Sequence, residues 1–357
     1  MTKELSEDII FVHPSLLGGG AERVAIALSS FFVERGYRFT FLLTKDKGVK
    51  YAIPEGVTVV DDIADSSVNP LQQIRYIRSA MQGNPRATFI SFLPHQNMYT
   101  LIASIGMPNK VIVSVRNDPR FDFPGDRVLP IVRNMLYRKA AEIVFQTDAQ
   151  KKLFPQELQA KGTVILNPIS SSVPEPFAGS RRKVIVTSGR LEEQKNHAMT
   201  IKAFSQFHQS HPDYVLEIFG EGSLECELKQ LAEDLGLTGS ICFEGFSSRA
   251  LDYIRTASVF VMSSRFEGLS NSMLEALVMG VPTVCTRCGG GGAEAVINNG
   301  VNGVLVDVDD IDGEAEALLK IIDDCDYARA LSCAALELRD KLKLTSIGAC
   351  WEELLKH

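Results

Sequence analysis

The 357-residue sequence has no apolar run approaching the roughly 18 residues of a membrane-spanning helix, so we expect no transmembrane segment. The N-terminus is acidic and leads into a short apolar stretch, so we expect no secretory signal. All seven cysteines fall in the second half, and an odd number without such a signal favours reduced thiols in the cytoplasm. Cys285 and Cys288 have no second pair at zinc-ribbon spacing, so no metal site is expected.

Charge is divided unevenly along the chain. Residues 1–168 contain 20 Lys and Arg against 16 Asp and Glu, whereas the remainder contains 17 against 28. The first part could therefore face an anionic surface, but it is too weakly basic for a nucleic-acid-binding domain, and we expect no nucleic-acid partner. The composition, 45% apolar and 23% charged, is that of an ordinary globular protein.

The length and the apolar pattern predict two domains. One hydrophobic core stops growing at roughly 250–300 residues, which this chain exceeds. Continuous apolar stretches, typical of parallel strands buried on both faces, recur with helix-like segments between several of them. We expect strands near 8–13, 39–43, 57–60, 87–93, 111–115, 142–146, 163–166, 183–188, 214–219, 240–243, 258–262, 282–286 and 303–306.

The stretch 169–182, rich in Pro, Ser and basic residues, interrupts this alternation and predicts an interdomain linker. We therefore expect an α/β protein with a Rossmann-like domain at 1–168 and a second at 183–340. A C-terminal helix at 341–357 follows, and we expect it to pack back on the N-terminal domain.

Three glycines, Gly18, Gly19 and Gly20, follow the first predicted strand and precede a helix that continues to about Arg35. Such a loop lets the backbone approach a ligand, although it could also serve only to turn the chain. A dinucleotide fingerprint would need glycine where Arg23 stands, which disfavours NAD.

Polar side chains follow two other strands of the first half. His95 and Asn97 follow one strand, and Arg116 and Asn117 follow the next. Ligands of parallel α/β sheets bind outside the carboxyl ends of the strands, so these four residues are site candidates. A lone loop histidine is also commonly structural.

The segment from Gly125 to Ala141 alternates apolar residues with Arg127, Arg133, Arg138 and Lys139. A basic amphipathic helix of this kind can lie against an anionic membrane surface. Packing into the core with a solvated basic face is an equally good interpretation.

The second half contains the densest chemistry. Gly189, Arg190 and Lys195 follow the strand at 183–188, and paired cations there suit a diphosphate leaving group. Glu267 and Glu275 flank a small polar turn that opens a helix after the strand at 258–262. Ser272 and Glu275 are also spaced as a capping box, which would give Glu275 a purely structural role.

These motifs together resemble the GT4 family of retaining glycosyltransferases, which have the GT-B fold. The resemblance rests on Gly189-Arg190-Leu191 with Lys195-Asn196, on Phe266-Glu267-Gly268-Leu269-Ser270-Asn271 with Glu275, and on a Gly-rich turn with Glu294. Gly18-Gly19-Gly20-Ala21-Glu22 is similar to the family's N-terminal loop. The resemblance to the family covers nearly the whole chain. It is strongest to bacterial members that build capsule, O-antigen or lipid-linked oligosaccharides. Such proteins have two Rossmann-like domains whose parallel sheets face each other across a cleft, with the acceptor bound by the N-terminal domain and the nucleotide sugar by the C-terminal domain.

The resemblance implies a role for each matching residue. Arg190 and Lys195 would hold the diphosphate of a nucleotide sugar, expected to be a UDP-sugar, with backbone amides at Leu269, Ser270 and Asn271. Glu267 would face the sugar and Glu275 the ribose. Further donor contacts would come from the glycine loops and one aromatic residue: Gly19, Gly20, Gly189, Gly220, Gly245, Phe246 and Gly268.

The resemblance also implies a hexosyltransferase that needs no divalent metal or cofactor and acts on a lipid-linked or polysaccharide acceptor. It would work in the cytoplasm or at the inner face of the cytoplasmic membrane. Many relatives carry histidine where this chain has Arg116, so whether Arg116 or His95 acts on the acceptor hydroxyl stays open. A nucleotide-sugar epimerase of the same architecture, or a non-catalytic sugar-binding subunit, are the alternatives.

Overall fold

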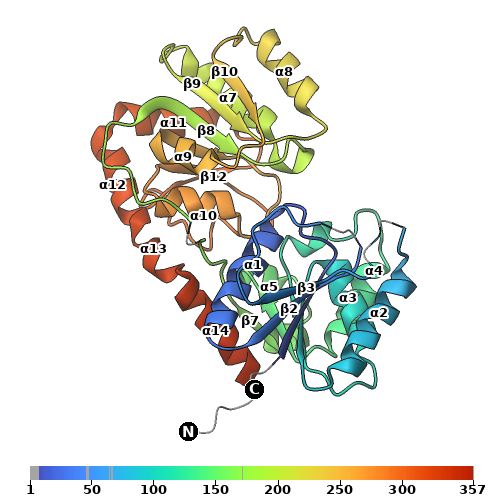
Figure 1. Cartoon of the computed structure of the whole chain (residues 1–357). Helices are drawn as coiled ribbons and strands as arrows, with labels where there is room; N and C mark the ends of the chain where they lie inside the picture. Colours follow the sequence, from blue (N-terminus) through green and yellow to red (C-terminus); the bar gives the residue numbers. More distant parts are fainter. Residues whose placement is uncertain (1–7, 46–47, 64, 66, 171, 357) are drawn as a thin grey trace. The chain divides into compact units, whose positions relative to one another are not determined.

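The computed structural model describes residues 8–45, 48–63, 65, 67–170 and 172–356, which form two compact units. Unit 1 contains the described residues up to Ser170 together with those from Leu342 onward, and unit 2 contains the residues between them. Each unit has its own parallel sheet with helices packed on it (Figure 1).

Unit 1 is built on a seven-stranded sheet in the order β3-β2-β1-β4-β5-β6-β7. Its central strands are buried on both faces, which explains why they read as unbroken apolar stretches. The strands are β1 (Asp8–His13), β2 (Arg38–Leu43), β3 (Val57–Val60), β4 (Thr88–Phe92), β5 (Val111–Ser114), β6 (Glu142–Phe145) and β7 (Gly162–Val164).

The helices of unit 1 cover this sheet and begin at recognisable sequence signals. At the start of α2, Asn69 and Gln72 form a reciprocal capping box and Pro70 takes the first helical position. The helices are α1 (Gly20–Glu34), α2 (Pro70–Gly83), α3 (Pro94–Ala103), α4 (Leu129–Tyr137), α5 (Asp148–Lys152), α6 (Gln156–Ala160) and α14 (Leu344–Lys356), with a 3₁₀ turn, η1 (Pro119–Phe121).

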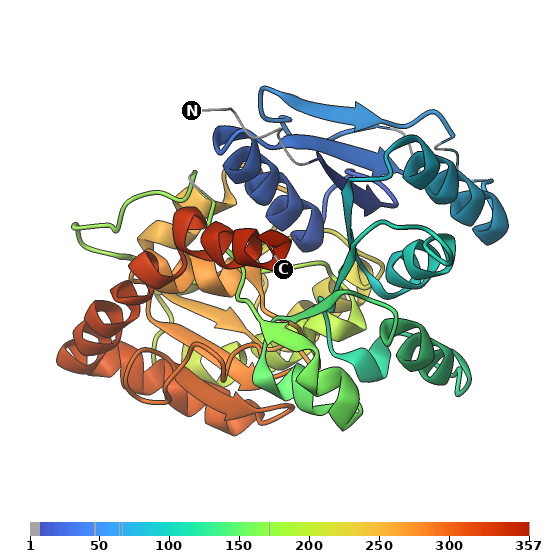
Figure 2. The same ribbon diagram turned by 90° about the horizontal axis from the view of Figure 1, so that it is seen from below.

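The C-terminal helix α14 belongs to unit 1 and packs against α1, as both ribbon views show in red and dark blue (Figures 1 and 2). The contact is close, because a Cβ atom added to Gly348 would lie 2.5 Å from the ring of Phe31. Trp351 is 1% exposed, and its ring lies 5.7 Å from that of Phe92 at the end of β4. The only tryptophan therefore sits in the core of unit 1.

Helix α4 differs from the predicted basic helix in one important residue. Arg133 is buried; its Nη1 atom lies 2.7 Å from Asp122 Oδ2, and its guanidinium stacks 4.5 Å from the ring centroid of Phe154. The prediction that Arg133 belongs to a solvated basic face is therefore wrong, because an acid eleven residues earlier draws it inward. The outward face of α4 is instead apolar, with Val128, Ile131 and Met135 between 58% and 65% exposed.

Unit 2 repeats the architecture with a six-stranded sheet in the order β10-β9-β8-β11-β12-β13. Its strands are β8 (Arg182–Ser188), β9 (Val215–Phe219), β10 (Ile241–Gly245), β11 (Ala257–Met262), β12 (Thr283–Arg287) and β13 (Val304–Asp307). Its helices are α7 (His197–His208), α8 (Glu225–Asp234), α9 (Ala250–Thr256), α10 (Asn271–Val278), α11 (Ile311–Asp323), α12 (Cys325–Leu336) and α13 (Leu338–Lys341), with a 3₁₀ turn, η2 (Glu193–Lys195).

The predicted α/β fold with two Rossmann-like parallel sheets is confirmed, and a strand is present at each of the thirteen predicted stretches. Within the described part of the chain, no helix combines the length and the hydrophobicity that crossing a membrane requires.

Candidate active site

The predicted donor residues of unit 2 gather where the strand order of its sheet reverses. The reversal lies between the neighbouring strands β8 and β11. The loop after β8 contains Gly189, Arg190 and Lys195, and the loop after β11 contains Glu267 and leads into α10. In open α/β sheets this position, at the carboxyl ends of the strands, is where ligands bind.

The loop after β8 folds back on itself so that Lys195 covers Gly189. The N–H of Gly189 donates to the Phe219 carbonyl at 2.9 Å, which continues the pairing of β8 with β9. Asn196 then adopts a left-handed conformation, with φ 51° and ψ 41°, and starts α7. A Cβ atom on Gly189 would lie 3.0 Å from Lys195 Cδ, so glycine leaves the space that the lysine side chain occupies.

The side chains of Lys195 and Glu267 form an ion pair between the two loops, and both are largely buried, at 14% and 16% exposed. Glu267 is fixed by its own backbone, because its N–H donates to the Gly289 carbonyl at 3.0 Å. Gln194 joins the loops a second time, by donating from Nε2 to the Phe266 carbonyl at 3.0 Å. The loops thus hold a cation and a carboxylate in direct contact at the switch point.

Arg190 is exposed beside this pair, and its Nη2 atom donates to the neutral Gln194 amide oxygen at 3.2 Å. Its guanidinium charge is therefore not used in an ion pair with a described residue. Two cations of the predicted set thus belong to one loop, one engaged with Glu267 and the other facing solvent.

The start of α10 contains the remaining donor candidates. Gly268, Leu269 and Ser270 are buried, and Ser270 is the N-cap of the helix without a side-chain capping hydrogen bond. The capping-box interpretation of Ser272 and Glu275 is wrong, because the helix begins two residues too early for it. Glu275 is buried within the helix, at 3% exposed.

Two glycines are required because loops pack directly on one another. A Cβ atom on Gly220 would lie 1.9 Å from the Gly189 carbonyl oxygen, and one on Gly292 would lie 1.8 Å from that of Gly268. No side chain fits at either position, so these glycines hold the two site loops in place. The N–H of Gly220 also donates to the Gly245 carbonyl at 2.8 Å, and the adjacent Phe246 is 70% exposed.

His197, the first residue of α7, was not among the predicted site residues. It is 2% exposed at the start of α7, and neither ring nitrogen forms a hydrogen bond that satisfies normal geometry with a described residue. Burial, together with the charge of Lys195, lowers the pKa of His197 to about 4. The ring is therefore neutral at physiological pH and adds no positive charge to that of Arg190 and Lys195. In the sequence, only its position two residues after Lys195 indicated that His197 lies near the site.

The predicted acceptor-side residues of unit 1 fall into different environments. His95 is exposed in the first turn of α3, with its ring centroid 5.0 Å from that of Phe123. Asn97 is fully buried and bonds to Ser91 Oγ, the Ser114 carbonyl and Tyr137, so it organises the core and does not face a ligand.

Arg116 and Asn117 lie just after β5 and are each partly exposed. The guanidinium of Arg116 lies over the ring of Phe92, the last residue of β4. The next residue, Leu93, has φ 73°, a value that non-glycine residues rarely adopt. The predicted glycine loop precedes α1, with Gly19 as the N-cap and Gly20 as the first helical residue.

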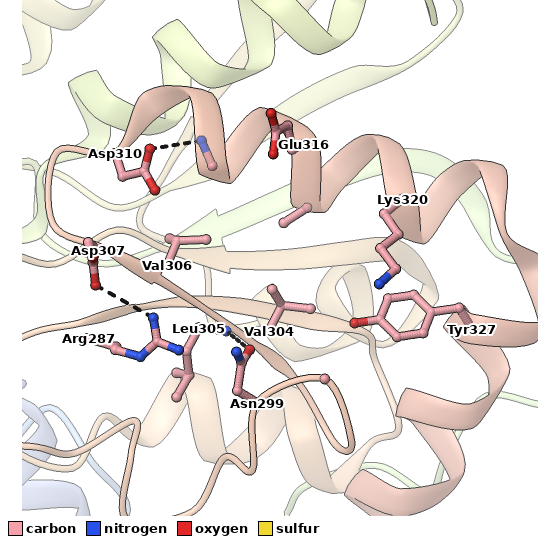
Figure 3. A pocket seen from close by; sticks show the side chains of 13 residues that line it. Arg287, Asn299, Val304, Leu305, Val306, Asp307, Asp310, Glu316, Lys320 and Tyr327 are labelled. Carbon is pink, nitrogen blue, oxygen red and sulfur yellow. Dashed lines mark hydrogen bonds and ion pairs between the residues drawn. The ribbon is translucent and has the colours of Figure 1, made fainter.

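A surface pocket lies elsewhere on unit 2, between the edge strand β13 and helix α11 (Figure 3). Arg287 Nη1 lies 3.5 Å from Asp307 Oδ1, and the Lys320 ammonium lies 4.3 Å from the ring centroid of Tyr327. None of the predicted donor residues lines it, so the pocket is a separate feature.

Known proteins resemble this chain over nearly its whole length. A Campylobacter jejuni enzyme, N-acetylgalactosamine-N,N'-diacetylbacillosaminyl-diphospho-undecaprenol 4-alpha-N-acetylgalactosaminyltransferase, is 26% identical over 88% of this chain and 90% of its own. A second enzyme of that organism is an alpha-1,4-N-acetyl-D-galactosaminyltransferase whose name specifies a diNAcBac-PP-undecaprenol glycan. It is 23% identical over 97% of this chain and 98% of its own.

Two solved structures share the fold. HepE from Anabaena, in complex with UDP, superposes with a TM-score of 0.82 at 19% identity, covering 98% of this chain and 99% of its own. Sucrose-phosphate synthase from Thermosynechococcus elongatus gives 0.84 at 13% identity, covering 98% of each chain. The family described as glycosyl transferases group 1 matches residues 172–337. The match to the glycosyl transferases group 1 family thus covers most of unit 2, and the two units have the α/β fold of GT-B glycosyltransferases.

Proposed function

We propose that this protein is a retaining hexosyltransferase of the GT4 family that moves a sugar from a nucleotide sugar, a UDP-sugar, to a lipid-linked or polysaccharide acceptor. The observation that supports this best is the contact between Lys195 and Glu267 at the switch point, with Arg190 exposed beside it. A diphosphate leaving group needs cations where its charge grows, and a sugar needs a carboxylate that accepts from its hydroxyls.

The roles follow from the positions of these groups. Arg190 and Lys195 stabilise the negative charge of the departing diphosphate. The backbone amides of Leu269, Ser270 and Asn271 at the start of α10 add to this stabilisation. Glu267 binds sugar hydroxyls while Lys195 bridges it to the phosphate, since an ammonium has three donors. Glu275 holds the ribose. The base lies near Gly220, Gly245 and Phe246.

The chemistry requires no protein base. As the diphosphate leaves, the sugar carbon becomes electron-poor, and the acceptor hydroxyl attacks the same face. A departing phosphate oxygen takes the hydroxyl proton, so the bond to the diphosphate breaks as the new glycosidic bond forms. Because Arg190 and Lys195 supply the positive charge, we propose that the reaction needs no divalent metal.

The acceptor assignment is supported by the two Campylobacter jejuni relatives, whose names specify glycans linked to undecaprenol through a diphosphate. The donor assignment is supported by the likeness to HepE, which was crystallised with UDP. Such an acceptor lies in a membrane, and the exposed apolar residues of α4 suit contact with it. We therefore place the protein in the cytoplasm, peripherally bound to the inner face of the cytoplasmic membrane.

Incubation of the full chain with a panel of nucleotide sugars and a prenyl-diphosphate-linked saccharide tests the proposal. We expect a glycosylated lipid whose new linkage has the anomeric configuration of the donor, by NMR, and undiminished turnover with a chelator. Conversion of the nucleotide sugar without acceptor would identify an epimerase instead. No transfer from any donor would refute the proposal, and a manganese requirement would refute its metal-free part.

A further inference from the structure

Arg116 of unit 1 is a cation whose partners are all neutral. Its Nη2 atom donates to Asn167 Oδ1 at 2.7 Å, its Nη1 approaches Ser114 Oγ at 3.4 Å, and its guanidinium lies 4.2 Å from the ring centroid of Phe92. Its Nε atom is buried and makes no hydrogen bond with a described residue. The residue as a whole remains partly exposed, so a ligand can reach it from solvent.

The nearby titratable groups do not supply a negative charge. His13, the last residue of β1, is fully buried, and its Nδ1 lies 2.6 Å from the Ser15 carbonyl oxygen. Burial, with a smaller contribution from Arg116, lowers the pKa of His13 to about 4, so it is neutral at physiological pH. Asp118, two residues after Arg116, is fully buried and paired with Arg120.

The position of Arg116 is that of a ligand-binding residue. The sheet of unit 1 reverses its strand order between β1 and β4, and β5 follows β4. His13, Phe92 and Arg116 therefore mark three adjacent carboxyl ends at the switch point, where α/β sheets bind ligands. The strained Leu93 belongs to the same edge.

A partly buried cation without a counter-charge is unfavourable, and an anionic ligand removes the penalty. Burial lowers the pKa of Arg116 to about 9, so the side chain is still charged at neutral pH. It cannot accept the proton of an acceptor hydroxyl, but its planar fork matches a phosphate. A purely structural role, holding Asn167 and covering Phe92, would not need a charge.

We propose that Arg116 binds the anionic group of the acceptor, the phosphate or diphosphate that joins the saccharide to its lipid. This inference rests on the proposed function, because it names the part of the lipid-linked acceptor that unit 1 recognises. It assigns Arg116 to acceptor binding and not to chemistry on the hydroxyl.

Calorimetric titration of the full chain tests this, with geranyl diphosphate as the probe and excess UDP present to occupy the donor site. Arg116→Met keeps the length and the stacking but removes the charge, and Arg116→Lys keeps the charge without the fork. The matched control is Arg75→Met, on the exposed face of α2. We expect at least tenfold weaker probe binding for Arg116→Met, an intermediate loss for Arg116→Lys, and wild-type binding for the control.

Thermal unfolding separates this role from a structural one. We expect Arg116→Met to unfold at the wild-type temperature or above, because an uncompensated charge is removed. Unchanged probe affinity in Arg116→Met would overturn the inference, whether or not the Tm of that variant is lower. If Arg116→Met does not fold, wild-type probe affinity in Arg116→Lys would overturn the inference instead. Tighter binding of geranyl diphosphate than of inorganic pyrophosphate assigns the site to a lipid diphosphate, and the reverse would overturn that assignment. UDP binding, measured separately, reports on the proposed function and is expected to be equal in all variants.

Discussion

In the loop after β8, Lys195 is the cation that contacts Glu267, so its removal should affect both binding and turnover. We expect Lys195→Met to lower kcat/KM by about 100-fold or more and to weaken UDP binding, because less positive charge faces the departing diphosphate. Steady-state kinetics and calorimetry with UDP measure the two effects. Lys202→Met, on the exposed face of α7, is the control and should behave as wild type. Near-normal turnover in Lys195→Met would remove its assigned role.

Glu267 should separate sugar recognition from diphosphate binding. Glu267→Gln keeps the shape but removes the charge, which frees Lys195 for the diphosphate. We therefore expect turnover to fall at least about tenfold while UDP binds as tightly as before or more tightly. Calorimetry with UDP, beside kinetics with the UDP-sugar, makes the comparison. If Glu267→Gln weakened UDP binding as much as Lys195→Met, Glu267 would not face the sugar.

Glu314 in α11 is fully buried, and neither carboxylate oxygen makes a hydrogen bond that satisfies normal geometry with a described residue. Burial raises the pKa of Glu314 to about 8. Between pH 4.5 and 8 the folded protein keeps this proton and the unfolded chain loses it, so stability should fall as pH rises through that window.

Glu314→Gln mimics the protonated form and should remove this loss. We expect its free energy of unfolding to exceed that of wild type by on the order of 3 kcal/mol more at pH 8 than at pH 5. Urea unfolding at the two pH values gives the difference. A constant offset between variant and wild type at both pH values would show that Glu314 ionises normally in the folded state.

At the scale of elements, helix α4 presents an apolar stripe to solvent. Val128, Ile131 and Met135 are spaced three and four residues apart, so they share one face, and Arg127 and Lys139 are exposed at the helix ends. Replacing the three apolar residues by Asn should weaken binding to vesicles containing anionic lipid by about tenfold or more. Flotation with such vesicles measures this. The control, Leu235→Asn with Val301→Asn on unit 2, should bind as wild type, and equal binding of both variants would exclude α4 as the contact.

The strands could be predicted because parallel strands buried on both faces are continuous apolar stretches, as in β4 and β5. The loop motif with Lys195 and Glu267 could be predicted because adjacent strands bring their carboxyl ends together. The burial of single polar residues could not be predicted from the sequence. Arg133 turns inward to Asp122, whereas Glu314 of α11 and His197 of α7 are buried on two helices that pack against each other. The sequence also left open whether Ser272 caps α10, because serine is favoured as an N-cap at position 270 as well.

At the scale of the whole molecule, each unit has its own hydrophobic core. Trp351 and Phe31 belong to a core cluster of unit 1, whereas Leu318 belongs to one of unit 2. Because the chain has a single tryptophan, its fluorescence reports on unit 1 alone, while circular dichroism reports on both units. We expect the two units to unfold in separate transitions, as domains with separate cores commonly do.

Gly348→Val and Leu318→Ala test this independence. In Gly348→Val the new side chain meets the ring of Phe31, and we expect unit 1 to lose about 1–3 kcal/mol, seen as a lower denaturant midpoint by fluorescence. In Leu318→Ala a fully buried side chain of unit 2 is truncated, which should cost about 2–5 kcal/mol and shift the transition seen by circular dichroism. The fluorescence midpoint of Leu318→Ala should stay at the wild-type value, because no residue of the unit 1 core has changed. An equal shift of the fluorescence midpoint in both variants would show instead that the two units unfold as one cooperative body.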